Sequence, residues 1–331
     1  MRRCTKCVLP DTFPGITFDE KGVCNYCAKF KGTEQLKEDK AVYFQKFKDL
    51  IAQAKDTADY DCTLSYSGGK DSTYTLYVLR EIFKLKVLAL VLDNGFISDQ
   101  AFANIKNVAE RLKADYQIVK PDFEMMKKIF NYAVDHPMYS PKTLERASTM
   151  CTSCIGLVKF SFLKIAIEKK IPMMAWGWSP GQAPLRSSIM KMNPAMFKST
   201  QEVLRKPMHD IVGDKINEYF LSEHDFEQKD AFPYNVSPLA FMDYDEEKIK
   251  EKIKELGWVA PEDVDSNSTN CLLNSFSNKV HIDRYGFHPY SFEIAEMVRT
   301  GVMDRDEGLE KIENVGVDAT IECAKKKLGI E

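Results

Sequence analysis

A short run with two glycines has the composition of a phosphate-binding turn. Ser67-Gly68-Gly69-Lys70-Asp71-Ser72 follows a strand-like run over 60–66 and opens a helix-like run over 71–84. Glycines let the backbone turn tightly and approach a ligand closely. The N–H groups and the dipole at a helix start then face an anion, to which Lys70 adds a positive charge. The alternative is a glycine-rich turn in an ordinary α/β protein.

The run is not a Walker P-loop, because Asp71 follows the lysine and the leading glycine spacing is absent. It resembles the PP-loop of the ATP pyrophosphatase superfamily, whose signature is S-G-G-x-D-S. The resemblance implies a fold like that of the adenine nucleotide alpha-hydrolases (HUP-like) and an ATP site that uses Mg²⁺. It also implies that Lys70 and Asp71 are catalytic, with Lys70 stabilising the pyrophosphate that leaves.

Four cysteines near the N-terminus have the spacing of a metal site. Cys4-x-x-Cys7 and Cys24-x-x-Cys27 are separated by 16 residues, which is typical of a four-thiolate zinc ribbon or knuckle. Four thiolates leave no open position on Zn²⁺, so we expect a structural or substrate-presenting role. The metal would supply much of the folding energy of so small a segment. The alternatives are rubredoxin-like iron and a pair of redox dithiols.

Three cysteines further along the chain could do chemistry. Cys151-x-x-Cys154 opens a helix-like run, and Cys271 follows a polar run over 265–270 that could cap another helix. A helix start lowers the pKa of a thiol and favours thiolates as metal ligands or nucleophiles. This arrangement suits a [4Fe–4S] cluster held by three thiolates, with one iron left open. The alternatives are a catalytic dithiol without a cluster and three structural cysteines. Two other cysteines are predicted to be buried packing residues: Cys62 and Cys323.

The order of the apolar runs predicts an α/β fold. Strand-like runs alternate with helix-like runs between residues 59 and 182, which indicates a doubly wound parallel sheet with right-handed crossovers. The run over 86–93 is almost continuously apolar, as in a strand covered on both faces. We divide the chain into a zinc-binding knuckle, a connecting helix, a PP-loop domain and a mixed, mainly helical C-terminal substrate region: 1–30, 31–58, 59–182 and 183–331.

Within the last region, residues 232–239 are interpreted as a loop and 245–256 as a charged helix. Several methionines with Phe197 are interpreted as a helical core or a pocket wall: Met190, Met192, Met196 and Met208. Three basic residues of the tail are candidate contacts for an anionic substrate, a solvated helix face being the alternative: Arg299, Arg305 and Lys311.

Ligands of parallel sheets bind beyond the carboxyl ends of the strands. The hexapeptide and Asp93 both follow predicted strands, and so does Gly177. For Asp93 alone, a solvated turn is an equal alternative. The predicted ATP contacts are Ser65, Ser67, Gly68, Gly69, Lys70, Asp71, Ser72, Leu92, Asp93 and Gly177.

The chain also resembles the iron–sulfur-dependent tRNA thiolation enzymes. The resemblance is carried by the PP-loop, the N-terminal four-Cys motif and the C-x-x-C with a later cysteine. It implies that Cys151, Cys154 and Cys271 hold the cluster and that Lys159 lies near the nucleotide. Those enzymes often carry a further C-terminal zinc pair, which this sequence lacks.

A second resemblance rests on the N-terminal hundred residues. The runs over 4–12 and 18–27, followed by the PP-loop, are similar to the N-acetyl sugar amidotransferases of surface-polysaccharide synthesis. Those proteins receive ammonia from a glutaminase partner, and no glutaminase domain is recognisable in this sequence.

Both resemblances imply one course of reaction. ATP adenylates a carbonyl oxygen of the substrate, pyrophosphate leaves, and a nucleophile displaces AMP. The three downstream cysteines favour sulfur transfer, to a tRNA base or a small molecule, over ammonia transfer. A hypothesis of another class is a zinc-ribbon ATP-binding sensor without turnover.

The composition sets the compartment and the partners that we expect. The 331 residues are 44% hydrophobic and 29% charged, as in globular proteins, and the net charge of −3 gives no global nucleic-acid signal. No run suggests a membrane span, and the N-terminus lacks the apolar segment of a secretory signal. Nine cysteines, partly in C-x-x-C pairs, are typical of cytoplasmic metal or redox proteins. We expect a sulfur donor or a separate glutaminase subunit as partner, and a homodimer is an open alternative to a monomer.

Overall fold

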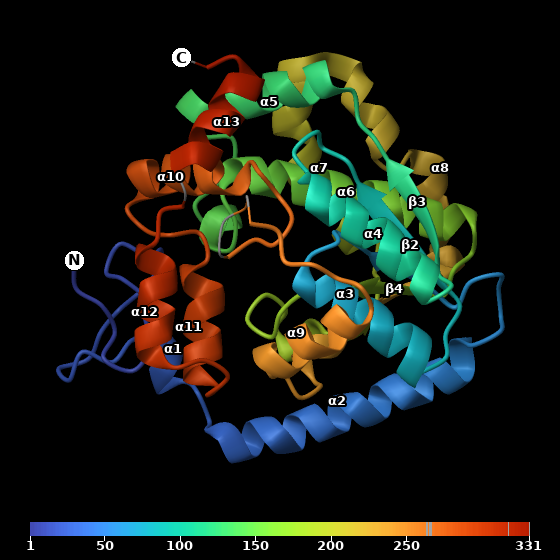
Figure 1. Ribbon diagram of the computed structural model, residues 1–331, viewed down its shortest axis with the longest axis horizontal. Coiled ribbons are helices and arrows are strands. Elements are labelled where there is room, and N and C mark those ends of the chain that lie inside the picture. Colours follow the sequence, from blue (N-terminus) through green and yellow to red (C-terminus); the bar gives the residue numbers. More distant parts are fainter. Residues whose placement is uncertain (263, 265–266, 317, 331) are drawn as a thin grey trace.

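The computed structural model describes residues 1–262, 264, 267–316 and 318–330, and its centre is a six-stranded sheet with helices on both faces (Figure 1). The strand order is β3-β2-β1-β4-β6-β5, and only β5 runs antiparallel to its neighbour. The strands are β1 (Cys62–Ser65), β2 (Val87–Leu92), β3 (Asp115–Val119), β4 (Met173–Trp176), β5 (Ile189–Lys191) and β6 (Tyr234–Val236). The predicted α/β fold with a parallel sheet is confirmed.

The central strands are buried on both faces, as their apolar runs predict. Alternate residues of β2 enter different cores, with Leu88 and Leu90 on one side and Val87, Ala89 and Val91 on the other. A strand covered on both faces has no solvent side, so its sequence shows no polar alternation.

The interpretation of residues 232–239 as a loop is wrong at β6, which extends the sheet beside β4. Met190 lies in β5 and not in a helix, whereas Met196, Phe197 and Met208 belong to α7. Strands of three residues are too short for a periodic pattern to reveal them.

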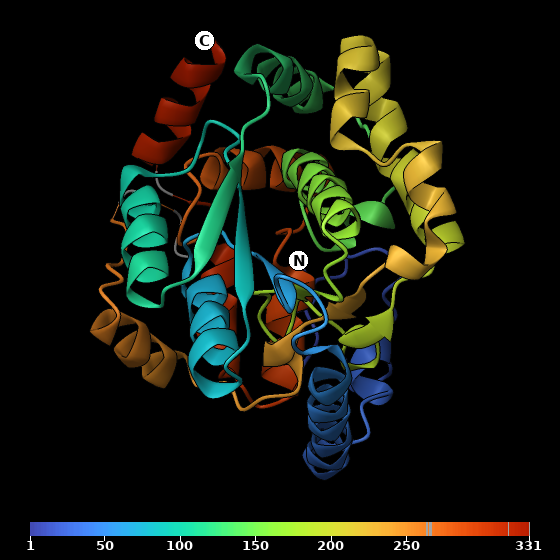
Figure 2. The same cartoon turned by 90° about the vertical axis from the view of Figure 1, so that its right-hand side faces the viewer.

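Helices cover the two faces of the sheet in separate layers (Figure 2). One layer contains α2 (Thr33–Ala54), α3 (Lys70–Tyr77), α4 (Asp99–Arg111) and α9 (Glu246–Glu255). The other contains α5 (Phe123–Asp135), α6 (Thr149–Glu168), α7 (Pro194–Val212), α8 (Glu223–Glu227), α10 (Asn274–Tyr285) and α13 (Asp318–Leu328). A π-helical turn, Val78–Ile82, continues α3 along the predicted helical run.

Two cysteines are predicted to pack in the interior, and the structure confirms this prediction for one of them and contradicts it for the other. Cys62 is buried in β1, as predicted. Cys323 is exposed, so that prediction is wrong. The helix α13 buries the face that carries Ile321, Ala324 and Leu328, and Cys323 lies off that face.

The helix α6 is long and apolar enough, by length and composition, to span a membrane. It has 20 residues, and its most apolar window has a mean hydropathy of 1.6. In the structure 61% of that window is buried, and α6 contacts β1, β2 and β4. It is therefore a core helix of this fold.

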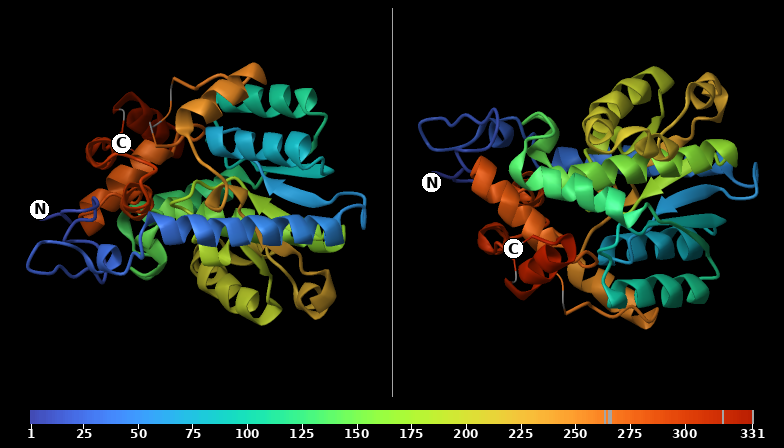
Figure 3. Two further views of the ribbon diagram at one scale, coloured as in Figure 1. Left: turned by 90° about the horizontal axis from the view of Figure 1, so that it is seen from below. Right: turned by 90° about the horizontal axis from the view of Figure 1, so that it is seen from above.

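The N-terminal segment packs against helices from the far end of the sequence (Figure 3). It includes α1 (Asn25–Ala28) and shares a third core with α11 (Ser291–Arg299) and α12 (Arg305–Glu313). Phe13 stacks on Phe292 with ring centroids 5.6 Å apart. The helix α2 then leads from this core to the sheet. The predicted domain boundaries at 30, 58 and 182 stay predictions.

Candidate functional site: a glycine turn beside three cysteines

The hexapeptide forms a tight turn between β1 and α3. Gly68 has a φ of +74°, and a Cβ there would lie 2.6 Å from the carbonyl oxygen of Ala101. A side chain is excluded at this position by both the backbone conformation and the contact. Ser72 Oγ donates to the carbonyl of Gly69 at 3.1 Å and lies 3.1 Å from Ser67 Oγ. These bonds hold the turn in one shape.

Two residues from a distant segment lie on the turn. Trp258 Nε1 donates to the carbonyl of Gly68 at 2.9 Å. The backbone N–H of Lys70, at the start of α3, donates to Thr269 Oγ1 at 3.0 Å. An anion that used this N–H would have to displace Thr269.

The side chain of Lys70 is held by Glu246, the first residue of α9, and by Tyr244, which lies just before this helix. Its ammonium lies 2.8 Å from Glu246 Oε2 and donates to Tyr244 OH at 2.9 Å. Tyr244 OH donates in turn to Asp71 Oδ1 at 2.8 Å. Burial opposes ionisation of Glu246, but Lys70, Lys250 and Lys311 together outweigh it and lower the pKa of Glu246 to about 2. Burial raises the pKa of Asp71 despite its two polar neighbours.

The three downstream cysteines line one cavity with the loop. This first cavity has a volume of about 240 Å³ and is bounded by Cys151, Cys154 and Cys271, by Ser65 and Ser67, and by the end of β2 at Leu92. Ser148 caps α6 by accepting from the backbone N–H of Cys151 at 3.2 Å. Cys271 reaches the cavity through a β-bridge with Ile97. Residues far apart in the sequence therefore meet at the carboxyl ends of β1 and β2, where such sheets bind ligands.

Amide groups approach the sulfur atoms of this cavity. Asn94 Nδ2 donates to Cys154 Sγ at 3.3 Å, and Asn274 Nδ2 lies 3.9 Å from Cys151 Sγ. Burial raises the pKa of the Cys154 thiol well above its ordinary value and that of Cys271 to about 12. The lowering of thiol pKa expected at a helix start is thus outweighed at Cys154, which stays protonated at neutral pH unless a cation binds it.

Two other predicted ATP contacts, Asp93 and Gly177, make contacts that hold the loops after β2 and β4 in place. Asp93 is 7% exposed, pairs with Lys120 at 3.1 Å and accepts from the N–H of Gly95 at 2.9 Å, so it closes the turn after β2. Gly177 lets the loop after β4 contact α3, because a Cβ there would lie 2.3 Å from Ser72 Cα.

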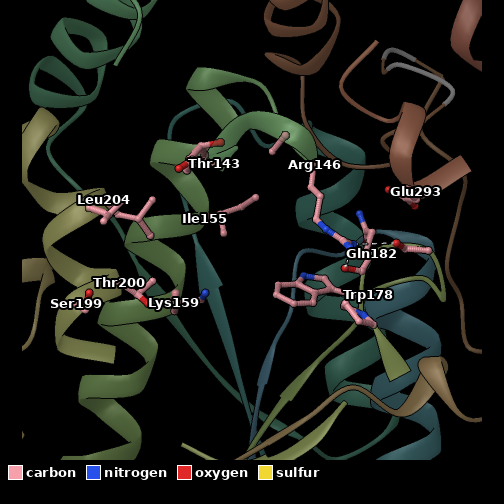
Figure 4. Close-up of a pocket in the computed structure, with 15 residues that line it drawn as sticks. Thr143, Arg146, Ile155, Lys159, Trp178, Gln182, Ser199, Thr200, Leu204 and Glu293 are labelled. Carbon is pink, nitrogen blue, oxygen red and sulfur yellow. Dashed lines mark hydrogen bonds between the residues drawn. The ribbon is translucent and has the colours of Figure 1, made fainter. Parts of the chain in front are cut away.

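Lys159 lies outside the first cavity. It lines a second cavity, of about 500 Å³, together with Arg146, Trp178 and Gln182 (Figure 4). Burial lowers the pKa of Lys159, and its ammonium lies 5.9 Å from the ring centre of Phe197.

The four N-terminal cysteines converge on one point. Their sulfur atoms are buried and all lie within 4.8 Å of one another. Cys4 Sγ is 3.8 Å from Cys27 Sγ, and Cys7 Sγ is 3.7 Å from Cys24 Sγ. Tetrahedral Zn–S bonds of about 2.3 Å place sulfur atoms about 3.8 Å apart. The site therefore fits a metal ion such as Zn²⁺. In the described part of the chain, no other group of three metal-binding side chains is this close.

Arginines cover this four-Cys site. Arg299 Nε donates to Cys27 Sγ at 3.4 Å, and its Nη2 lies 3.9 Å from Cys7 Sγ. Arg305 donates to the carbonyls of Cys7 and Cys4 at 3.2 and 3.1 Å. The expectation that these two arginines face an anionic substrate is therefore wrong, because both guanidinium groups are used within the four-Cys site. Lys311 pairs with Glu307 on α12.

Several residues of the site had no clear sequence signal. Tyr244, Glu246 and Glu293 each stand alone in ordinary loop or helix runs, and only the fold brings them near the loop and the second cavity. The polar run before Cys271 does point to Thr269. In that run, Asp265 and Ser266 lie outside the described residues.

Comparisons with known proteins give distant similarities. No family model matches the chain. An uncharacterized protein of Methanocaldococcus jannaschii is 22% identical over 334 residues, which cover 99% of each chain. Among solved structures, the U34-tRNA thiolase NcsA from Methanococcus maripaludis with its [4Fe–4S] cluster is 17% identical with a TM-score of 0.37, covering 96% of this chain and 98% of that one. A predicted subunit of tRNA methyltransferase from Methanocaldococcus jannaschii is 14% identical with a TM-score of 0.34, covering 70% and 91%. At these values the function has to be argued from the geometry of the site.

Proposed function

We propose that the chain binds ATP at the β1–α3 loop, activates a carbonyl oxygen of its substrate and replaces that oxygen by sulfur. One observation carries the proposal. Ser67 of the loop shares the first cavity with Cys151, Cys154 and Cys271, so a sulfur site adjoins the nucleotide loop. Three thiols gathered from two segments beside a phosphate-binding turn favour sulfur transfer over a purely structural role.

The proposed reaction has two displacements. The substrate's carbonyl oxygen attacks the α-phosphorus of ATP, the bond to the bridging oxygen breaks, and pyrophosphate leaves with its electron pair. A sulfur nucleophile then attacks the carbon that carries this oxygen, and AMP leaves with the former carbonyl oxygen. The N–H groups of the loop and the dipole of α3 would stabilise the phosphate charge. Lys70 would take part by exchanging Glu246 for a phosphate oxygen, with Mg²⁺ near Asp71 sharing the charge.

The residues of the first cavity fit a [4Fe–4S] cluster. Cys151, Cys154 and Cys271 would hold it, and an iron without a protein ligand supplies a position for extra sulfide. Asn94 and Asn274 present N–H groups to two of the sulfurs, as partners of metal thiolates do. Burial keeps Cys154 and Cys271 protonated without a cation, so metal binding would be coupled to proton release.

At the N-terminus we assign Zn²⁺ to Cys4, Cys7, Cys24 and Cys27, with a structural role, since four thiolates fill its coordination. Thiolate-bound metals of this kind are typical of the reducing cytoplasm, which is where the proposal places the protein.

An ammonia-dependent amidotransferase is the second candidate. It rests on the similarity of the runs over 4–12 and 18–27, with the PP-loop, to the N-acetyl sugar amidotransferases. Ammonia would come from a separate glutaminase partner. A sensor without turnover, in contrast, would bind ATP and release no pyrophosphate with any substrate.

The test is anaerobic purification followed by iron, sulfide and zinc analysis and a visible spectrum. We expect one zinc and about four irons per chain. Cys271→Ala should lose the iron and keep the zinc, whereas Cys323→Ala, at an exposed cysteine, should change neither. Zinc alone, with three titratable thiols at positions 151, 154 and 271, would contradict sulfur transfer from a cluster and favour the amidotransferase.

A further inference from the structure

Two cavities lie on either side of one helical wall. The first half of α6 presents two adjacent stripes, each with a spacing of i, i+3 and i+7, which places the members of a stripe on one face. The stripe that lines the first cavity is Cys151, Cys154 and Val158, and the stripe that lines the second is Thr152, Ile155 and Lys159. Ile155 lines both cavities. A ligand in the second cavity would therefore lie next to the proposed sulfur and nucleotide site.

Two cations face the second cavity without a carboxylate partner. Lys159 points into it from α6, and Arg146 points into it from the turn before α6 (Figure 4). Arg146 donates to the carbonyls of Gly181 and Gln182 and lies over the ring of Phe292. Within residues 1–262, 264, 267–316 and 318–330, neither cation has a carboxylate oxygen at ion-pair distance. The charges of Glu296, Glu145 and Glu293 reach Arg146, whereas burial is the one cause that acts on the pKa of Lys159. A buried ammonium without an ion-pair partner is suited to an anionic ligand.

The other walls suit a ring with hydroxyl groups. Trp178 presents its indole to the cavity and is held by stacking on Trp176, with ring centroids 4.7 Å apart. Gln182, Ser199 and Thr200 add groups that both donate and accept hydrogen bonds. A cavity of about 500 Å³ has the size of a small-molecule site.

The surroundings do not suit a polyanion. Ile155 and Val203, which line the cavity, are exposed apolar residues, at 38% and 52%. The nearby cations on α7 and before α6 are paired with acids: Lys142 with Glu145, Lys198 with Glu223, and Arg205 with Glu202. RNA binding relies on several lysines or arginines that are free to meet phosphates.

One wall of the second cavity lies within electrostatic reach of the loop. Glu293 of α11 lines it, and Ser179 Oγ donates to Glu293 Oε1 at 2.6 Å. The charges of Asp71 and Lys70 act on this carboxyl, so the acidic end of the cavity is within electrostatic reach of the loop.

We propose that the second cavity is the acceptor site and takes a hydroxylated ring compound with one carboxylate or phosphate group, held by Lys159, Arg146 and Trp178. This inference rests on the proposed function, because the acceptor is the molecule that ATP would activate.

The test measures binding of three probes to the purified chain without ATP, by ligand-observed NMR. Glucuronate carries a carboxylate and glucose 1-phosphate carries a phosphate, each on a hydroxylated six-membered ring. Glucose has the same kind of ring and no anionic group. We expect both anions to bind at least about tenfold more tightly than glucose. Lys159→Met should remove about tenfold or more of that preference. Lys164→Met is the matched control on the same helix, because its ammonium contacts the Glu218 carbonyl outside the cavity.

Equal binding of all three probes, no binding of the anions, or an equal loss in Lys164→Met would overturn the inference. So would tRNA binding that Lys159→Met weakens and the small anions do not compete. Pyrophosphate release is measured separately. If anionic rings bind and no acceptor supports AMP formation, the cavity assignment stands and the proposed function fails. If AMP formation is normal in Lys159→Met, the cavity assignment fails and the proposed function stands.

Discussion

The two cysteine sites of this chain differ in how closely the sulfur atoms approach one another and in how far other groups of the protein cover them. At the N-terminus four sulfurs meet at the spacing of a tetrahedral ion, and Arg299 and backbone N–H groups cover them. In the first cavity three cysteines surround open space beside the β1–α3 turn. A closed set of ligands stabilises a fold, whereas an open set leaves a position for a reacting atom. The same residue type therefore lies in two different environments in one chain.

The helix α11 connects the N-terminal four-Cys site with the second cavity. Its last residue, Arg299, contacts two of the N-terminal sulfurs, and its Glu293 lines the second cavity. Phe292, next to Glu293, packs on the rings of Phe13 and Tyr26 and lies under Arg146. The metal site can thus position the wall of the second cavity without touching a substrate.

The largest expected contrast comes from removing one C-x-x-C pair from each site. Replacing both Cys24 and Cys27 by Ser should abolish zinc binding and unfold residues 1–30, because structural zinc contributes about 10 kcal/mol or more to such a segment. Replacing both Cys151 and Cys154 by Ser should keep the zinc and the fold. Zinc analysis and limited proteolysis distinguish the two. Equal protease resistance of residues 1–30 in both variants would show that the N-terminal metal site is not structural.

A smaller effect is expected from the arginine that covers the sulfurs. Arg299→Met removes the N–H groups directed at Cys27 and Cys7 and should weaken zinc binding by about 10- to 100-fold. Competition with a chromogenic chelator measures this change. Arg305→Met is the matched control, since that guanidinium donates to carbonyls and not to sulfur. Zinc affinities that fall equally in both variants would mean that packing, and not the thiolate charge, explains the loss.

The sequence predicts what depends on local pattern. The hexapeptide, the buried central strands and the spacing of the four N-terminal cysteines are all continuous or short-range signals, and the structure agrees with the fold that they indicate. The strands β5 and β6 were missed because three residues carry no period. Cys323 was misjudged because the buried face of α13 depends on what the helix packs against.

The site depends more on long-range contacts. Cys271 joins Cys151 and Cys154 through its bridge with Ile97, which no spacing rule predicts. Lys70 was expected to face phosphate, but α9 brings Glu246 to it. Such pairs arise from the packing of separate elements. The sequence therefore identifies candidate residues by their type, but it does not predict which residues they contact.

The smallest expected effect concerns Glu293, at the other end of α11 from the sulfurs. Burial raises its pKa from 4.5 to about 7, so the folded chain keeps a proton that the unfolded chain loses between these values. The resulting stabilisation is full below pH 4.5 and is lost as the pH rises through 7. Glu293→Gln still accepts from Ser179 but does not titrate. Relative to this variant, the wild type should lose about 1 kcal/mol of unfolding free energy between pH 5.5 and 6.5, measured by urea denaturation.

Parallel stability curves for the two proteins would show that the Glu293 carboxyl is solvated and that the second cavity has no buried acidic wall. The same experiment tests the connection through α11. If the zinc site holds this helix in place, the Cys24→Ser, Cys27→Ser double variant should also lose the pH difference, because a displaced α11 would expose Glu293 to water. The Cys151→Ser, Cys154→Ser double variant should keep it, since its changes lie on the stripe of α6 that lines the first cavity.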